Sequence, residues 1–132
     1  MVSGIEGLEA FLRVLGLGYV RRGDSLLVEV EDRRLGGVGV VVSFDPDTGF
    51  VRVAVPTDVE PTEGGLWWLL RENFSVTTYK YGLDYDGFIV VLVDVPGEAV
   101  GSARDLRRLV AEAVEGYRRL MERVEAGGEE ES

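Results

Sequence analysis

The chain of 132 residues contains no cysteine and no histidine, and its only lysine is Lys80. The absence of cysteine excludes disulfides, thiolate nucleophiles and thiolate metal sites. Without histidine there is no imidazole base and no imidazole metal ligand, so the commonest hydrolase machinery is missing. Neither a GxxxxGK[ST] phosphate loop nor a GxGxxG fingerprint occurs. We therefore expect a protein that is not an enzyme and holds no cofactor and no metal.

Acidic residues outnumber basic ones by 24 to 14, which gives a formal net charge of -10. A surface of this sign repels phosphate backbones, so nucleic acid is not an expected partner. The longest apolar runs, such as 88–93, are far shorter than the roughly 20 residues of a membrane helix, and residues 1–16 lack the pattern of a signal peptide. We expect a cytoplasmic protein with no membrane association.

The spacing of apolar residues predicts an α+β domain with three helices and five strands. Two hairpins are indicated by the turns at 45–49 and 84–87. Thr62 is the expected N-cap of the second helix, and a Ser102/Asp105 capping box opens the last helix. We expect one domain over residues 1–126, a twisted antiparallel sheet with helices packed against it, and an acidic disordered tail over 127–132. The expected order is α-β-β-β-α-β-β-α, with helices at 5–15, 61–74 and 102–124 and strands at 26–31, 38–44, 50–55, 76–83 and 88–95.

Two Asp-x-Asp pairs, Asp45 with Asp47 and Asp84 with Asp86, have the residue types of an acid/base pair or of a hard-cation site. Both pairs lie in predicted hairpin turns, where aspartate is favoured because its side chain bonds the local backbone. We interpret both pairs as turn residues.

The second helix carries two tryptophans whose sides we expect to differ. A rotation of about 100° per residue places Trp68 among Arg71 and Glu72. Because tryptophan is enriched at interface hot spots, we expect Trp68 to project into an interface. The alternative is a more deeply buried helix in which Trp68 belongs to the core. The side that we expect to face the sheet carries Leu66, Leu69, Leu70 and Phe74, with Trp67 at its flank.

Alternating residues of the last strand, 88–95, are apolar on both sides, so both faces of the sheet need a cover there. The first and last helices can cover one face. The other face needs the second helix, a second subunit or a bound client, unless a strongly twisted sheet covers itself.

The order of elements, the small size and the acidity resemble the type III secretion chaperone-like fold, including the YbjN-like family. The local match covers the helix LWWLLRENF at 66–74, the hairpin at 79–95 and the amphipathic helix at 102–124. The resemblance implies a homodimer that holds a polypeptide partner against apolar sheet surface and sheet edges. It also implies a dimer or partner interface through the middle helix, at Leu66, Trp67, Trp68, Leu69 and Phe74.

Our leading interpretation is a small acidic protein-binding module, chaperone-like or adaptor-like, that holds a polypeptide through the sheet. One alternative is a small-ligand or carboxylate-based enzyme domain that uses Asp, Glu and Arg with Tyr79, Tyr81 or Tyr85. A second alternative is a structural or regulatory subunit of a larger assembly.

Overall fold

The computed structural model describes the backbone of residues 1–131 and the side chains of residues 1–127. The described residues form three α-helices, six strands and one 3-10 turn. In chain order these are α1 (Ile5–Val14), β1 (Tyr19–Arg22), β2 (Ser25–Asp32), β3 (Gly36–Asp45), β4 (Phe50–Pro56), α2 (Glu63–Ser75), β5 (Lys80–Leu83), β6 (Ile89–Pro96), η1 (Gly97–Ala99) and α3 (Ala103–Glu131).

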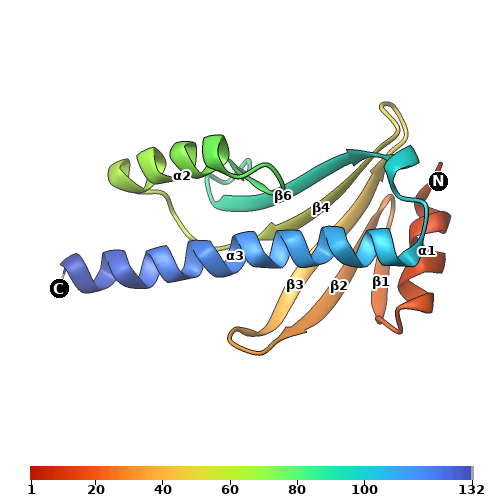
Figure 1. The fold of residues 1–132 in the computed structure, drawn as a ribbon, viewed down its shortest axis with the longest axis horizontal. Coiled ribbons are helices and arrows are strands. Elements are labelled where there is room, and N and C mark those ends of the chain that lie inside the picture. Colours follow the sequence, from red (N-terminus) through yellow and green to blue (C-terminus); the bar gives the residue numbers. More distant parts are fainter. Residues whose placement is uncertain (132) are drawn as a thin grey trace.

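All six strands form one antiparallel sheet in the order β1-β2-β3-β4-β6-β5 (Figure 1). The predicted α+β class is thus confirmed, with one strand more than expected. β1 was missed because it has only four residues, two of them arginines, and its hairpin to β2 depends on Gly23 at φ 61°. β5 begins at Lys80, four residues later than predicted.

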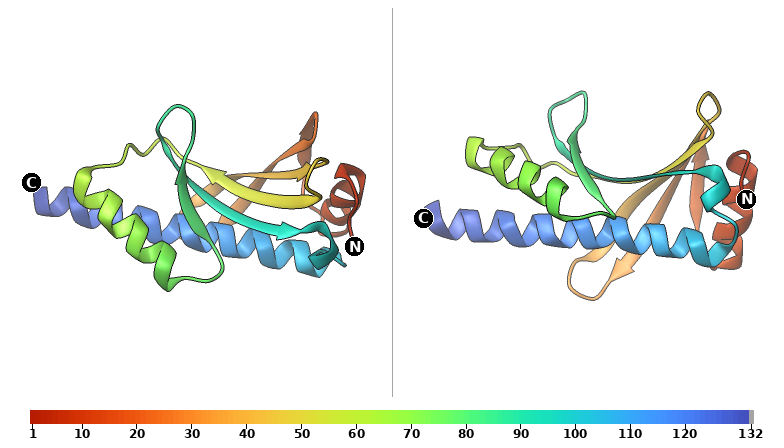
Figure 2. Two further views of the ribbon diagram at one scale, coloured as in Figure 1. Left: turned by 90° about the horizontal axis from the view of Figure 1, so that it is seen from above. Right: turned by 45° about the horizontal axis from the view of Figure 1, so that its top comes forward.

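The three helices lie on one face of the sheet. α3 crosses the sheet diagonally, contacts β3, β4 and β6, and extends past the sheet toward its C-terminal end (Figures 1 and 2). α1 contacts α3 and β3. α2 is on this face as well, because its Trp68 ring lies 5.5 Å from the Tyr81 ring, whose hydroxyl donates to the Gly116 carbonyl of α3. The second helix therefore does not cover the opposite face, which we call the open face.

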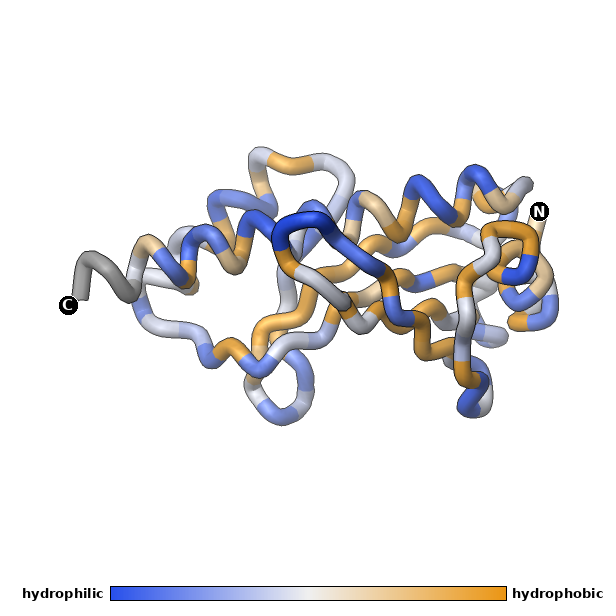
Figure 3. The backbone as a smooth tube through the Cα atoms, turned by 90° about the horizontal axis from the view of Figure 1, so that it is seen from below, coloured by the Kyte–Doolittle hydropathy of each residue, from blue (hydrophilic) through white to orange (hydrophobic). Residues whose placement is uncertain are grey.

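The core lies between α3 and the strands, where alternate strand residues meet the apolar side of the helix (Figure 3). Gly116 marks the closest approach. A Cβ atom at this position would lie 2.6 Å from both the Tyr79 ring and a methyl group of Val91. Only glycine allows α3 this distance from β6.

Two arginines on the outer side of α3 form ion pairs with other elements. Arg119 pairs with Glu72 of α2 at 2.9 Å, and Arg118 pairs with Asp32 of β2 at 2.6 Å and also with Glu115. The ion pairs with Glu72 and Asp32 connect α3 to residues 47 and 86 positions away in the sequence. The backbone of α3 is helical as far as Glu131. The domain boundary at residue 126 and the disordered tail over 127–132 stay predictions. Ser132 lies outside the described residues.

Candidate protein-binding site

Helix α2 begins at Glu63, two residues after the predicted start and directly after the predicted N-cap. The Thr62 hydroxyl oxygen accepts a hydrogen bond from the Gly65 N–H at 2.9 Å, which confirms Thr62 as the N-cap. Gly64 and Gly65 are poor helix formers, so the cap and the tertiary contacts of α2 have to stabilise the first turn. The first turn also carries Glu63, which interacts favourably with the positive end of the helix dipole.

Polar side chains occupy much of the side of α2 that faces the rest of the chain. Glu72 pairs with Arg119, which raises the pKa of the arginine. The Asn73 carboxamide accepts from the Tyr81 N–H at 2.7 Å and donates to the Tyr81 carbonyl at 3.0 Å. Only Leu69 is buried among the residues of this helix, and Trp68 is half-buried against the core.

The opposite side of α2 presents large apolar side chains to solvent. The exposed fractions are 40% for Leu66, 66% for Trp67, 67% for Leu70 and 93% for Phe74. These four residues fall within one side of the helix at 100° per residue, and we call them the outer stripe. The helix is thus inverted relative to an ordinary surface helix, which turns its apolar side inward. Contiguous exposed apolar surface of this kind marks an interaction site.

The structure divides the five predicted interface residues between the two sides of the helix. Leu66, Trp67 and Phe74 lie in the outer stripe, whereas Trp68 and Leu69 face inward. The expectation that Trp68 projects outward is wrong, and Leu70, which we expected to face the sheet, is exposed. The helical period was wrong about the direction of the helix, and it also grouped Leu69 with Leu66, Leu70 and Phe74, although Leu69 lies on the buried side. Both sides of α2 carry large apolar residues, and the contacts of Glu72 and Asn73 decide which side turns inward.

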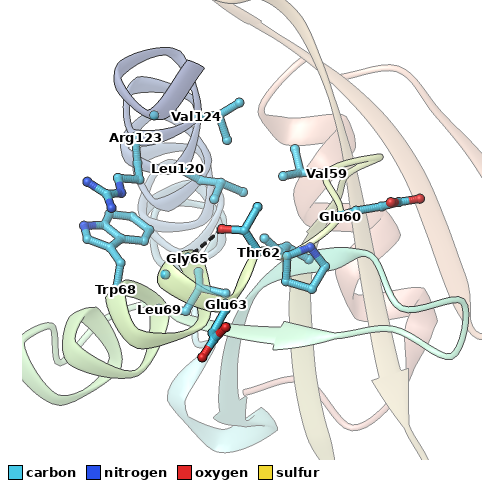
Figure 4. A pocket seen from close by; sticks show the side chains of 14 residues that line it. Val59, Glu60, Thr62, Glu63, Gly65, Trp68, Leu69, Leu120, Arg123 and Val124 are labelled. Carbon is cyan, nitrogen blue, oxygen red and sulfur yellow. Dashed lines mark hydrogen bonds between the residues drawn. The ribbon is translucent and has the colours of Figure 1, made fainter. Parts of the chain in front are cut away.

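A cavity of about 570 Å³ separates the first turns of α2 from the C-terminal half of α3. Figure 4 shows Trp68 and Arg123 on one side of this space, with Leu120 and Leu69 from the two helices and Thr62 at the helix start. The lining is largely apolar. Its acidic lining residues are Glu60 and Glu63, and none of the four residues of the outer stripe lines it.

The open face of the sheet carries an apolar row that crosses five strands. Successive cross-strand partners on this face are Val20, Leu27, Val41, Ala54 and Leu92. At the β1 end, Val20 is 57% and Leu27 is 38% exposed, whereas Ala54 in the middle is only 9% exposed. The β1 end of this face is therefore more exposed than its centre and remains available for contact.

The acidic pairs singled out from the sequence have structural roles. Asp45 Oδ1 accepts from the Asp47 N–H at 2.9 Å, and Asp84 Oδ1 accepts from the Asp86 N–H at 2.9 Å and from the Phe88 N–H at 3.0 Å. The interpretation of these aspartates as turn residues is confirmed. Within the described residues, no group of three or more acidic side chains is placed to hold a metal ion.

The three tyrosines named for an enzyme alternative are not brought together around a cavity. Tyr79 and Tyr81 are buried, with ring centroids 5.6 Å apart, and burial raises the pKa of both. Tyr85 is fully exposed at the tip of the β5–β6 hairpin. None of the three lines the cavity between α2 and α3.

In the described part of the chain, no helix has the length and apolar content needed to cross a membrane.

The fold and this surface define a class of protein: a small α+β domain with its helices on one face of the sheet, in which α2 turns large apolar side chains outward. Two solved structures share the overall fold. A chain of the HopA1–SchA chaperone–effector complex matches with a TM-score of 0.67 and 20% identity, over 87% of this chain and 90% of that one. YbjN from E. coli, a candidate transcription regulator, matches with a TM-score of 0.69 and 18% identity, over 97% of this chain and 96% of that one.

These similarities show that the chain has the type III secretion chaperone-like, YbjN-like fold, as the sequence pattern indicated. No protein-family model matches the chain, and no curated protein matches it. At identities of this size the likeness concerns the fold, and function has to be argued from the surface of the chain itself.

Proposed function

We propose that this chain is a cytoplasmic polypeptide-binding module, chaperone-like or adaptor-like and without enzymatic activity, that works as a homodimer. The observation that carries the proposal is the inverted orientation of α2, which exposes the outer stripe while Glu72 and Asn73 face inward. A fold shared with a chain of a chaperone–effector complex supports the polypeptide partner.

The outer stripe fits a second copy of the same chain. Glu63 lies near the start of α2 and Arg71 lies two turns later, and both are exposed. In an antiparallel contact about a two-fold axis, each Glu63 approaches the partner's end that carries Arg71, so the surface is self-complementary in charge. Two copies together supply eight large apolar side chains to one interface. Phe74 is 93% exposed, and covering it is worth roughly 1.5 to 3 kcal/mol.

The β1 end of the open face is the surface that we assign to the polypeptide partner. Val20 and Leu27 are exposed there, on the opposite face of the sheet from α2. Because the two surfaces lie on different faces, a dimer through α2 leaves both open faces accessible. The net charge of -10 keeps a protein with such apolar surface soluble and favours basic partners.

Sedimentation velocity of the wild type and of Phe74→Asp tests the dimer. We expect the wild type to sediment as a dimer and Phe74→Asp to sediment as a monomer with unchanged circular dichroism. Tyr85→Asp is the matched control, because it replaces another fully exposed aromatic residue outside α2. A monomeric wild type, or equal dissociation in both variants, would contradict the proposed dimer.

Suppression of the aggregation of a reduced, unfolded model polypeptide tests the second part of the proposal. We expect protection by the wild type and its loss in Leu27→Glu, which places a charge on the open face. Leu83→Glu changes an exposed leucine on the same sheet, in β5, and should leave protection intact. Protection that is absent in the wild type would reject the chaperone-like activity without affecting the dimer.

A further inference from the structure

Strand β5 forms one edge of the sheet, and edge strands expose backbone groups that can pair with another chain. In an antiparallel ladder, alternate residues of an edge strand direct their N–H and C=O groups away from the sheet. Tyr81 is such a residue. Its N–H donates to Asn73 Oδ1 at 2.7 Å, and its carbonyl accepts from Asn73 Nδ2 at 3.0 Å.

The carboxamide of Asn73 carries N–H donors and a C=O acceptor on one planar group, and it turns one N–H and the oxygen toward Tyr81, as a peptide group of a strand would. It therefore makes with Tyr81 the two hydrogen bonds that one residue of an additional strand would make. The end of α2 is fixed in this place from two further sides. Lys80 Nζ donates to the Asn73 carbonyl at 2.6 Å and also to the Val76 carbonyl, and Glu72 pairs with Arg119 of α3.

We propose that Asn73 closes the β5 edge by imitating a strand residue, so that neither a polypeptide partner nor a second copy can extend the sheet at this edge. Asn73 thus determines which surfaces of the chain bind proteins, because it removes one of the two sheet edges. The argument uses only the inward side of α2, so it does not depend on the proposed dimer through the outer stripe.

Hydrogen exchange of single backbone amides in the wild type provides a first test. Leu83 lies two residues after Tyr81 and faces the same way, and within the described residues no side chain binds its N–H. We expect the Tyr81 amide to exchange at least about tenfold more slowly than that of Leu83, since the two amides differ by the hydrogen bonds of Asn73. Equal protection of both amides would overturn the proposal, and this comparison needs no variant.

Asn73→Leu tests the carboxamide directly, because leucine has a similar size and no polar atoms. We expect the Tyr81 amide to exchange about 10- to 100-fold faster, while the Lys80 and Gly82 amides, which face β6, keep their wild-type rates. Arg119→Gln is the control, since it weakens the attachment of α2 and leaves Asn73 in place. If Arg119→Gln accelerates Tyr81 as much as Asn73→Leu does, the effect belongs to helix docking and the proposal fails.

Edge pairing itself is measured by sedimentation velocity in a Phe74→Asp background, where the outer stripe no longer contributes to association. We expect Asn73→Leu/Phe74→Asp to form larger species whose share rises with protein concentration, whereas Phe74→Asp alone does not. A double variant that sediments like Phe74→Asp alone would show that the edge needs no closure. A failure of the dimer proposal would appear in the wild type instead, so the two proposals are distinguishable.

Discussion

Replacing two glycines by alanine should change the stability of this protein in opposite directions. Gly116 sits where α3 approaches β6, and a Cβ atom there would lie 2.6 Å from Tyr79 and from Val91, whose side chains are 4% and 0% exposed. Gly64, in the first turn of α2, has open space around the same position. The same substitution therefore meets a filled core at one site and solvent at the other.

The expected magnitudes follow from two opposing terms. Alanine is a better helix former than glycine by about 1 kcal/mol in a helix interior, and Gly64→Ala gains up to this amount, roughly 0.5 to 1 kcal/mol. At Gly116 the same gain is opposed by overpacking, which costs roughly 1 to 3 kcal/mol. We place Gly116→Ala in the upper half of that range, because the methyl group clashes with two buried side chains at once. The expected net loss is about 1 to 2 kcal/mol.

Urea unfolding followed by circular dichroism, at one fixed protein concentration, measures both variants against the wild type. We expect a lower midpoint for Gly116→Ala and an equal or higher midpoint for Gly64→Ala, separated by about 2 kcal/mol. If Gly116→Ala is as stable as Gly64→Ala, the close approach of α3 to the sheet is not a constraint and the packing argument is refuted.

Three further predictions concern titration and fluorescence. A hydrogen bond from the Tyr19 hydroxyl lowers the pKa of Glu9 in the folded protein. The stability that this carboxylate contributes is therefore present above its unfolded pKa, near 4, and is lost as the pH falls. The urea midpoint of Glu9→Gln should consequently decrease less than that of the wild type when the pH is lowered. Burial raises the pKa of Tyr81, so the stability that its neutral phenol contributes is present below an unfolded pKa near 10 and is lost at higher pH. In a titration followed at 295 nm, Tyr81→Phe should lack the phenol that ionises at the highest pH. The same variant should lose about 1 kcal/mol of stability, because the hydrogen bond to the Gly116 carbonyl of α3 is missing. Trp68→Phe should leave red-shifted emission from the exposed Trp67 that moves to the blue on association, whereas Trp67→Phe should leave blue-shifted emission that is independent of concentration.

Local chemistry allowed much of the fold to be predicted from the sequence. Turn aspartates at 45 and 84, the Thr62 cap and the helical period of 102–124 depend on neighbours within a few residues, so each could be recognised without a partner element. The strand at 19–22 could not, because its four residues become a strand only by pairing with β2. Sequence patterns identify elements that bury an apolar side, and β1 leaves three of its four residues exposed.

The candidate site shows the same division. The sequence alone determined that 66–74 is a helix with more large apolar residues than one side can hold, that common catalytic groups are absent, and that the chain is acidic. Only the tertiary structure decided which side of α2 faces outward. That choice depends on Arg119 and Tyr81, which meet Glu72 and Asn73 across 47 and 8 residues of sequence. Polar contacts of this kind between different elements leave no periodic pattern in a sequence, because nothing in either segment alone indicates its partner.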